Sequence, residues 1–329
     1  MAETKMSKAP NVPIIGGGPA GMSCALWLAN SGLRPIIIER AVALGGIARA
    51  NPYPNEWLLS RPGETGRENA EAFARHIRQA GVECRLETHP VAVCQRADGT
   101  FELELAASDG AAPQPLCCPA VVIATGTEFR GQSWLDAVPN ARSLAERGRL
   151  HIGPTWAGER NADLGAHVAV IGGGDNAFDV SRMLVEKGVK VSIVLRSLTP
   201  RAQPLMIERL RPHEASGMAR VLAGAVVTSL EQSGAHVDVR LSSSEAIEVD
   251  HVLLLLGYQP NTAEPWLKEL AVALDANRYI IVDGNTETSC RGVFAVGDVA
   301  NPAHPCIATA LGTGTMAARE IQRRFAMKS

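Results

Sequence analysis

The sequence lacks the features that direct a chain to a membrane, a nucleic acid or an oxidising compartment. No apolar run approaches the roughly 18 residues that span a bilayer, and the polar start MAETKMSKAPNV contains no secretory signal. Lysine and arginine total 32 against 34 acidic residues, so no excess of positive charge favours a polyanion. Seven irregularly spaced cysteines favour reduced thiols over a disulfide framework. We therefore expect a cytoplasmic protein with no nucleic-acid or membrane partner.

A pattern of strand, glycine turn and helix occurs twice in these 329 residues, a length that suffices for about two domains. The first instance is VPIIGGGPAGMSCALWLANSGLRPIIIER, in which Gly16, Gly18 and Gly21 form a G-x-G-x-x-G motif between a strand and a helix. The glycines permit a tight turn, close approach of a pyrophosphate and helix-on-strand packing. Glu39 ends the second strand, where an acid can accept hydrogen bonds from ribose hydroxyls. The unit predicts a dinucleotide site, with a purely structural glycine turn as the alternative.

The second instance is HVAVIGGGDNAFDVSRMLVEKGVKVSIVLRSLTPR, with Gly172, Gly174 and Ala177 in the G-x-G-x-x-A variant. Its second strand ends at Arg196 instead of an acid, and Arg201 follows shortly afterwards. A cation at this point suits the 2′-phosphate of NADPH, and the missing carboxylate removes a repelling charge. The pattern favours NADPH over NADH, unless both arginines are merely solvated surface residues.

A third signal lies near the C-terminus, in TSCRGVFAVGDVANP and the helix start LGTGTMAAREI. Asp298 follows Gly297 at the end of an apolar strand, where it can hydrogen-bond the ribityl chain of FAD. One half-site near each end of the chain indicates a single FAD domain that is interrupted by an NADPH domain. The segments VVIATGTEFRG and VLLLLGYQPNT are the expected crossings between them.

These motifs, in this order, resemble the low-molecular-weight thioredoxin reductase family, a class of pyridine nucleotide-disulfide oxidoreductases, over essentially the whole chain. The resemblance implies an α/β fold with two Rossmann-like, three-layer domains. FAD is expected in residues 1–128 and 262–329, NADPH in residues 129–261, and the chain is expected to form a homodimer. No metal is expected.

The resemblance also carries cofactor contacts onto matching positions. Those expected for FAD are Gly16, Gly18, Pro19, Ala20, Gly21, Glu39, Arg40, Gly46, Ala124, Thr125, Gly126, Gly297, Asp298 and Ile307. Those expected for NADPH are Gly172, Gly173, Gly174, Asp175, Asn176, Ala177, Arg196, Ser197, Arg201 and Gly257. The family usually has two adjacent arginines in its phosphate motif, whereas here Ser197 follows the first arginine, which weakens discrimination between NADPH and NADH.

The redox dithiol of thioredoxin reductases is missing. The stretch HIGPTWAG places Gly153 and Trp156 where that family carries the cysteines of C-x-x-C. Neither side chain can cycle between dithiol and disulfide, so the route from flavin to a protein disulfide is closed. We expect a flavoprotein that passes electrons from NADPH to an external acceptor: an iron–sulfur protein, ferredoxin, flavodoxin or a dedicated partner enzyme. Thioredoxin reductase-like ferredoxin–NADP reductases also lack the dithiol.

Several side chains are candidates for the flavin site. Trp156 either covers the isoalloxazine or fills the volume of the lost dithiol turn, and Arg61 is either a cation near the flavin or an exposed loop residue. Cys306 either reacts with the cofactor or fills space at a helix start. His151 and His304 flank the expected site and could move protons, although a lone histidine is more often structural.

Two other functions stay open. An atypical disulfide reductase or dithiol oxidase would use another cysteine such as Cys306, and a nucleotide-responsive protein would hold FAD as a structural group. Cys117 and Cys118 are adjacent in a strand, where they are expected on opposite faces. A bacillithiol-disulfide-reductase-like subgroup carries a cysteine in its GGGPxG motif, and position 20 is alanine here.

Overall fold

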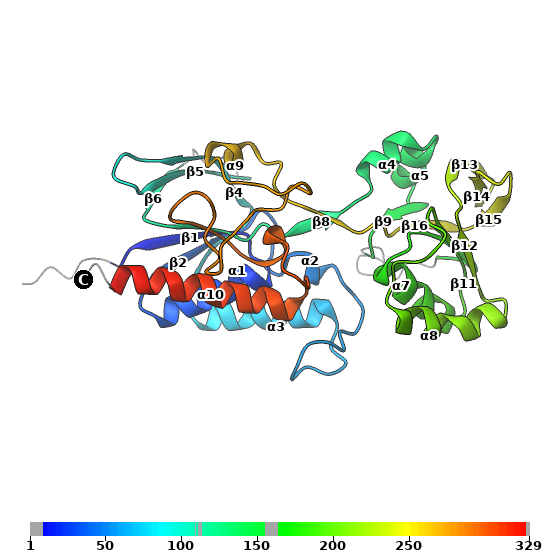
Figure 1. Ribbon diagram of the computed structural model, residues 1–329, viewed down its shortest axis with the longest axis horizontal. Helices are drawn as coiled ribbons and strands as arrows, with labels where there is room; N and C mark the ends of the chain where they lie inside the picture. The colour runs from blue at the N-terminus through cyan, green and yellow to red at the C-terminus, as the bar shows by residue number, and fades with distance from the viewer. Residues whose placement is uncertain (1–8, 109, 111–113, 155–163, 327–329) are drawn as a thin grey trace, which may run out of the picture. The chain divides into compact units, whose positions relative to one another are not determined.

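The computed structural model describes residues 9–108, 110, 114–154 and 164–326. The chain forms two compact units (Figure 1): residues 1–128 and 260–329 make the first, and residues 129–259 make the second. The second unit is therefore inserted into the first. The first unit resumes at residue 260, two residues before the expected residue 262. The two crossings, β8 (Thr127–Phe129) and β17 (Tyr258–Pro260), pair as a two-stranded sheet.

A five-stranded parallel sheet forms the centre of the first unit, in the order β18-β7-β1-β2-β3. Its strands are β1 (Asn11–Ile15), β2 (Arg34–Ile38), β3 (Glu83–Arg85), β7 (Val121–Ile123) and β18 (Val293–Ala295). Both faces are covered, as parallel sheets require. Ile14 therefore belongs to the core on one face and Ile15 to the core on the other.

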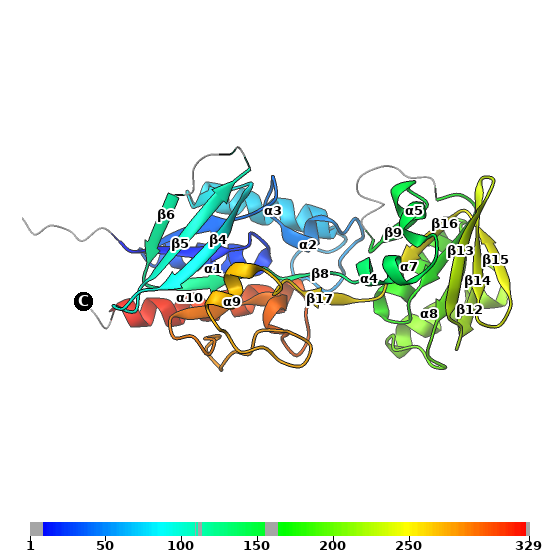
Figure 2. The same cartoon turned by 90° about the horizontal axis from the view of Figure 1, so that it is seen from above.

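Helices cover one face of this sheet and a second, antiparallel sheet covers the other (Figures 1 and 2). The helical layer contains α1 (Pro19–Asn30), α3 (Gly66–Gln79) and α10 (Ile307–Ala326). The opposite layer contains β4 (Thr88–Gln95), β5 (Phe101–Ala107), β6 (Gln114–Cys118) and the short helix α9 (Pro265–Glu269). The short elements α2 (Gly46–Arg49) and the 3₁₀ helix η1 (Gly297–Ala300) complete the unit.

The second unit repeats this plan with a parallel sheet in the order β12-β11-β10-β16-β9. Its strands are β9 (Leu150–Ile152), β10 (His167–Ile171), β11 (Lys190–Leu195), β12 (Ala219–Ala223) and β16 (His251–Leu254). The antiparallel layer consists of β13 (Val227–Ser233), β14 (His236–Leu241) and β15 (Ala246–Val249). The helices are α4 (Gln132–Ala137), α5 (Ala141–Glu146), α7 (Asp175–Glu186) and α8 (Pro204–Ala215).

Two parallel sheets, each entered through a strand, glycine turn and helix, confirm the predicted α/β fold with two Rossmann-like units. None of the helices in the described ranges is long and apolar enough to cross a bilayer.

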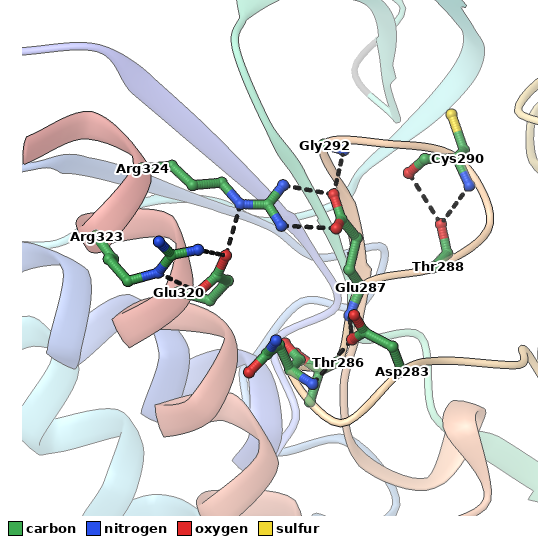
Figure 3. A network of polar contacts seen from close by, with 10 residues as sticks. Asp283, Thr286, Glu287, Thr288, Cys290, Gly292, Glu320, Arg323 and Arg324 are labelled. Atoms are coloured by element: carbon green, nitrogen blue, oxygen red, sulfur yellow. Dashed lines mark hydrogen bonds and ion pairs between the residues drawn. The ribbon is translucent and has the colours of Figure 1, made fainter. Parts of the chain in front are cut away.

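The last helix of the first unit is held by a network of charges (Figure 3). Arg324, in the final turn of α10, donates from Nη2 to Oε2 of Glu287 at 2.6 Å and from Nε to Oε1 of Glu320 at 2.7 Å. Arg323 donates from Nε to the other oxygen of Glu320 at 2.8 Å. The Arg324 guanidinium also lies 5.2 Å from the ring centre of Phe294 in β18. Helix α10 is thereby fixed to the edge of the parallel sheet.

Candidate functional site

The first glycine turn sits where strands β1 and β7 end side by side. A side chain at Gly16, whose φ is +113°, would overlap the carbonyl oxygen of Ala124. A side chain at Gly21 would overlap the carbonyl oxygen of Gly16, so the turn packs directly on α1. Gly18 precedes α1 with extended backbone and has no protein atom within 4 Å of its added Cβ position. The turn thus leaves open space at the helix N-terminus, where free N–H groups can receive a phosphate.

Glu39, at the end of β2, holds this turn in place. Its Oε2 accepts a hydrogen bond from the Gly17 N–H at 2.7 Å, and its Oε1 accepts one from the Ala41 N–H at 2.8 Å. The carboxylate is 8% exposed. Each oxygen keeps a second lone pair, so an additional ribose donor can be accommodated. The neighbouring Arg40 pairs with Glu264 at 3.2 Å on the surface.

The C-terminal half-site meets the first turn directly. A Cβ on Gly297, whose φ is +71°, would lie 2.7 Å from the Cβ of Ala20 in α1. The next residue, Asp298, has a buried Oδ1 with no hydrogen-bond partner among the described residues. Burial raises the pKa of this carboxyl group. An orphaned buried acceptor beside a dinucleotide turn needs a donor, and the hydroxyls of a ribityl chain would supply one.

Helix α10 starts beside the same place. The Gly297 N–H donates to Oγ1 of Thr313 at 2.9 Å, and a side chain at Gly314 would overlap the carbonyl oxygen of Ala20. The contact brings α10, whose first residue is Ile307, onto the start of α1. On the other side, the Gly46 Cβ position lies 3.1 Å from the Gly18 Cα. The turns around Gly18, Gly46 and Gly297 therefore form one cradle.

The two crossings are joined by hydrogen bonds within the first unit. Asn261 donates from Nδ2 to the carbonyl oxygen of Thr125 at 2.7 Å, and its own N–H donates to the carbonyl oxygen of Gly126 at 3.0 Å. The Thr125 hydroxyl donates to the carbonyl oxygen of Asn261 at 3.1 Å. These contacts fix Thr125 and Gly126, two of the expected FAD positions.

The glycine turn of the second unit has the same geometry as the first. A side chain at Gly172 would overlap the carbonyl oxygen of Leu255, so the ends of β10 and β16 lie close together. Gly173 packs against Leu195, Ala177 is fully buried, and the space beside Gly174 is open. This unit also offers a helix N-terminus and an open glycine, as an anion site requires.

Both arginines expected to bind a 2′-phosphate lie near this turn. Arg196 follows the last residue of β11 and is exposed. The chain then returns, and the Arg201 N–H donates to the carbonyl oxygen of Gly173 at 2.7 Å. Within the described part of the chain, neither guanidinium has an ion pair. The side chain of Ser197 donates to the carbonyl oxygen of Thr199 at 2.8 Å.

The first turn of α7 makes contacts that the sequence did not predict. Both oxygens of Asp175 accept hydrogen bonds from Gln203, from its N–H at 2.8 Å and from its Nε2 at 3.0 Å. Asn176 donates from Nδ2 to the hydroxyl of Tyr258 at 2.8 Å. Tyr258 is the first residue of β17 and directly follows Gly257, so this contact connects two of the expected NADPH segments.

A side chain at position 153 would meet the ring of Phe129. Gly153 follows β9, has a φ of +71° and donates its N–H to the carbonyl oxygen of Leu254 at 2.9 Å. A Cβ at this position would lie 2.5 Å from Cδ2 of Phe129 and 2.8 Å from its Cε2. The ring of Phe129 therefore occupies the space that a side chain at position 153 would need. Trp156, the second position of the missing motif, lies outside the described residues.

The family model for pyridine nucleotide-disulphide oxidoreductases matches residues 10–320. The chain belongs to this family. Members of the family are flavin-dependent oxidoreductases, and its thioredoxin reductases and ferredoxin–NADP reductases contain FAD and use NADPH. The orphaned Oδ1 of Asp298 and the two open glycine turns fit such a pair of dinucleotides.

Similar proteins in this family carry different names. The chain is 30% identical over 304 residues to a ferredoxin–NADP reductase of Limosilactobacillus fermentum, covering 89% of this chain and 86% of that one. It is 29% identical to a glucosaminate ammonia-lyase of Pseudomonas fluorescens, covering 98% and 97%. The solved structure of the T. acidophilum thioredoxin reductase matches with a TM-score of 0.81 and 26% identity, covering 97% and 100%.

The remaining candidate side chains make contacts within the protein. The guanidinium of Arg61 pairs with Glu64 on its own loop, so its charge is already compensated. His151 lies 3.1 Å from His251, Nε2 to Nδ1, and their rings stack. The carbonyl oxygen of His304 accepts a hydrogen bond from Thr309 at 2.7 Å. The expectation of a flavin-proximal cation therefore gains no support for Arg61.

The cysteines of this family member show no dithiol. All seven are free. Cys117 is exposed and Cys118 is buried, on opposite faces of β6 as expected, and burial raises the pKa of Cys118 to about 12. Cys306 is half-buried with its Sγ 3.5 Å from Oγ1 of Thr309, and its N–H donates to the same hydroxyl at 3.1 Å.

Asn261, Phe129 and Tyr258 were not among the site residues expected from the sequence. The crossing motifs contained all three, but their roles depend on which strands end side by side. The signal that could have identified Phe129 and Tyr258 is an aromatic residue in each crossing strand. Phe129 is the last residue of β8, and Tyr258 is the first residue of β17.

Proposed function

We propose that this chain carries electrons from NADPH through FAD to an external acceptor, without a dithiol of its own. FAD occupies the cradle of the first unit and NADPH the glycine turn of the second. When bound, the two cofactors supply hydride transfer from nicotinamide to flavin, and the protein supplies binding and orientation. The observation that carries the proposal is Gly153, which has no thiol and whose added Cβ would meet the ring of Phe129.

In the first unit, the open N-terminus of α1 receives the FAD pyrophosphate, and Glu39 both holds the turn and accepts a ribose hydroxyl. Asp298 accepts a hydroxyl of the ribityl chain, which satisfies its buried Oδ1. Arg40 belongs to the rim, since it pairs with Glu264 at 3.2 Å.

In the second unit, Arg196 and Arg201 bind the 2′-phosphate that distinguishes NADPH from NADH. Two observations support this assignment: no acid follows β11, and both guanidinium groups lack ion pairs among the described residues. The main chain of Arg201 lies against the glycine turn, so the charge can reach a phosphate bound there.

The acceptor we propose is a one-electron carrier such as a ferredoxin, a flavodoxin or an iron–sulfur partner. Reduced flavin can release its two electrons one at a time, which suits a one-electron acceptor. The similarity to the L. fermentum ferredoxin–NADP reductase supports this class of acceptor. Cys306 is a free cysteine, and no other cysteine pairs with it among the described residues.

An anaerobic titration with NADPH followed by acceptors tests this function. We expect the yellow protein to bleach with NADPH and to reduce ferricyanide and a ferredoxin quickly, while a protein disulfide is reduced no faster than by free reduced flavin. The Cys306→Ser variant should retain all of these rates. Rapid disulfide reduction that Cys306→Ser abolishes would support the dithiol alternative. A flavin that stays oxidised under excess NADPH would contradict the whole proposal.

A further inference from the structure

An aromatic pair lies at the edge of the second unit, and neither glycine fingerprint explains it. The rings of Phe129 and Tyr258 have centroids 5.0 Å apart and are tilted by 36°. Phe129 is the last residue of β8 and Tyr258 the first residue of β17, so the pair lies where the chain enters and leaves the unit. Tyr258 is 36% exposed, so part of the residue is accessible to a ligand.

The order of the parallel strands places this pair along the path of a bound dinucleotide. In such sheets, ligands cross the carboxyl ends of the strands at the point where the strand order reverses. Here the reversal lies between β10 and β16. Arg196 follows β11 and Gly172 follows β10, so the phosphate groups lie on that side. The other half of the dinucleotide then extends toward the ends of β16 and β9.

The ends of β16 and β9 are where the aromatic pair is held. Gly257, with a φ of +88°, turns the chain after β16 and leads into Tyr258. The ring of Phe129 lies against Gly153 after β9, 2.5 Å from where a Cβ would be. The Tyr258 hydroxyl accepts a hydrogen bond from Asn176, in the first turn of the fingerprint helix, at 2.8 Å. The tyrosine is therefore fixed to the helix that faces the pyrophosphate.

We propose that Tyr258 is the contact surface for the nicotinamide ring, with Phe129 and Asn176 as positioning residues behind it. The inference rests on the proposed function, because it assumes that the second unit binds NADPH. A flat aromatic face stacks on a planar heterocycle, and the oxidised nicotinamide is in addition a cation, which aromatic faces attract. The aromatic pair thus takes up space next to the position of the missing dithiol and orients the hydride-bearing ring.

Binding measurements on the full-length, FAD-loaded protein separate the two halves of the dinucleotide. The ligands are NADP⁺ and 2′,5′-ADP, which has the adenosine, the 2′-phosphate and one phosphate of the pyrophosphate but no nicotinamide riboside. Loss of one stacking contact costs about tenfold in affinity, equivalent to about 1.4 kcal/mol. We expect Tyr258→Ala to weaken NADP⁺ about tenfold and to leave 2′,5′-ADP unchanged. Calorimetry gives both constants without turnover.

Three further variants make the comparison specific. Tyr258→Phe keeps the ring and should keep most of the NADP⁺ affinity, whereas Tyr258→Leu keeps the volume without the aromatic face and should behave like Tyr258→Ala. Leucine also covers the case in which alanine unfolds the unit. Arg196→Ala should weaken both ligands to the same extent, because both carry the 2′-phosphate.

The outcomes test the role of Tyr258 and the proposed function separately. Equal affinities of Tyr258→Leu and wild type for NADP⁺, or an equal loss for NADP⁺ and 2′,5′-ADP, would overturn the role of Tyr258 and leave the proposed function intact. A wild-type protein that binds neither ligand would overturn the proposed function itself. A loss confined to NADP⁺ supports both.

Discussion

The contact between Gly153 and Phe129 gives a quantitative prediction for the substitution Gly153→Ala. An L-residue in left-handed backbone costs about 1–2 kcal/mol, and Gly153 has a φ of +71°. The new methyl group also meets the Phe129 ring at 2.5 Å, and such overpacking costs about 1–3 kcal/mol more. We expect a total loss of stability of roughly 2–5 kcal/mol.

Gly148→Ala is the matched control, because Gly148 has a φ of +69° and no atom within 4 Å of its added Cβ. The backbone cost and the lost flexibility of the unfolded chain are then the same in both variants. At about 2–4 °C per kcal/mol, the clash alone should lower the Tm of Gly153→Ala by roughly 2–12 °C relative to Gly148→Ala.

Differential scanning calorimetry of the full chain measures both transitions. In a Phe129→Ala background the extra cost of Gly153→Ala should largely disappear, since the ring that it meets is gone. Equal melting temperatures for Gly153→Ala and Gly148→Ala would refute the reasoning, and so would an extra cost that persists without Phe129. Equal melting temperatures would mean that position 153 has room for a side chain, whereas a persistent extra cost would mean that a contact other than the Phe129 ring causes it.

Three further predictions concern the first unit. Asp298→Ala should weaken FAD binding roughly ten- to a hundredfold, which is what the loss of a hydrogen bond to a charged group costs. Flavin fluorescence on reconstitution measures the affinity, and Asp298→Asn, which keeps an oxygen acceptor, should lose less of it. The hydrogen bonds from Arg323 and Arg324 hold the pKa of Glu320 at about 2, below its ordinary 4.5. The contribution of Glu320 to the free energy of unfolding is therefore complete above about pH 4.5 and is lost as the pH falls toward 2. Urea unfolding across this range should show a steeper loss of stability with acid in wild type than in Glu320→Gln. Cys306→Ser should leave the FAD content and the rate of bleaching by NADPH unchanged in stopped-flow absorbance, and a large loss would give this thiol a role at the flavin.

The two dinucleotide units were predictable from the sequence because their signals are local. Gly16, Gly18 and Gly21 stand at fixed spacings between an apolar strand and a helix, and the structure shows that the first and last of them are required by close backbone contacts. The same holds for Gly172, whose turn abuts the end of β16. Such contacts depend on neighbours within one unit of strand, turn and helix.

What the sequence could not provide depends on contacts between distant segments. The double role of Glu39 appears only once the Gly17 and Ala41 N–H groups are placed around it. That position 153 is glycine was visible in the sequence, but its contact with the ring of Phe129, which belongs to another strand, was not. The antiparallel sheets, the second layer of each unit, were likewise not assigned strand by strand.

The central claim is that electrons leave this protein from the flavin and not from a cysteine pair. An anaerobic reductive titration with dithionite, combined with alkylation of thiols before and after, counts the electrons taken up by the flavin and the thiols formed from cysteines in one sample. We expect the flavin to bleach fully after one two-electron equivalent per FAD, with the same number of alkylated cysteines in the oxidised and reduced protein. Uptake of a second equivalent, accompanied by the appearance of two new thiols, would contradict the account.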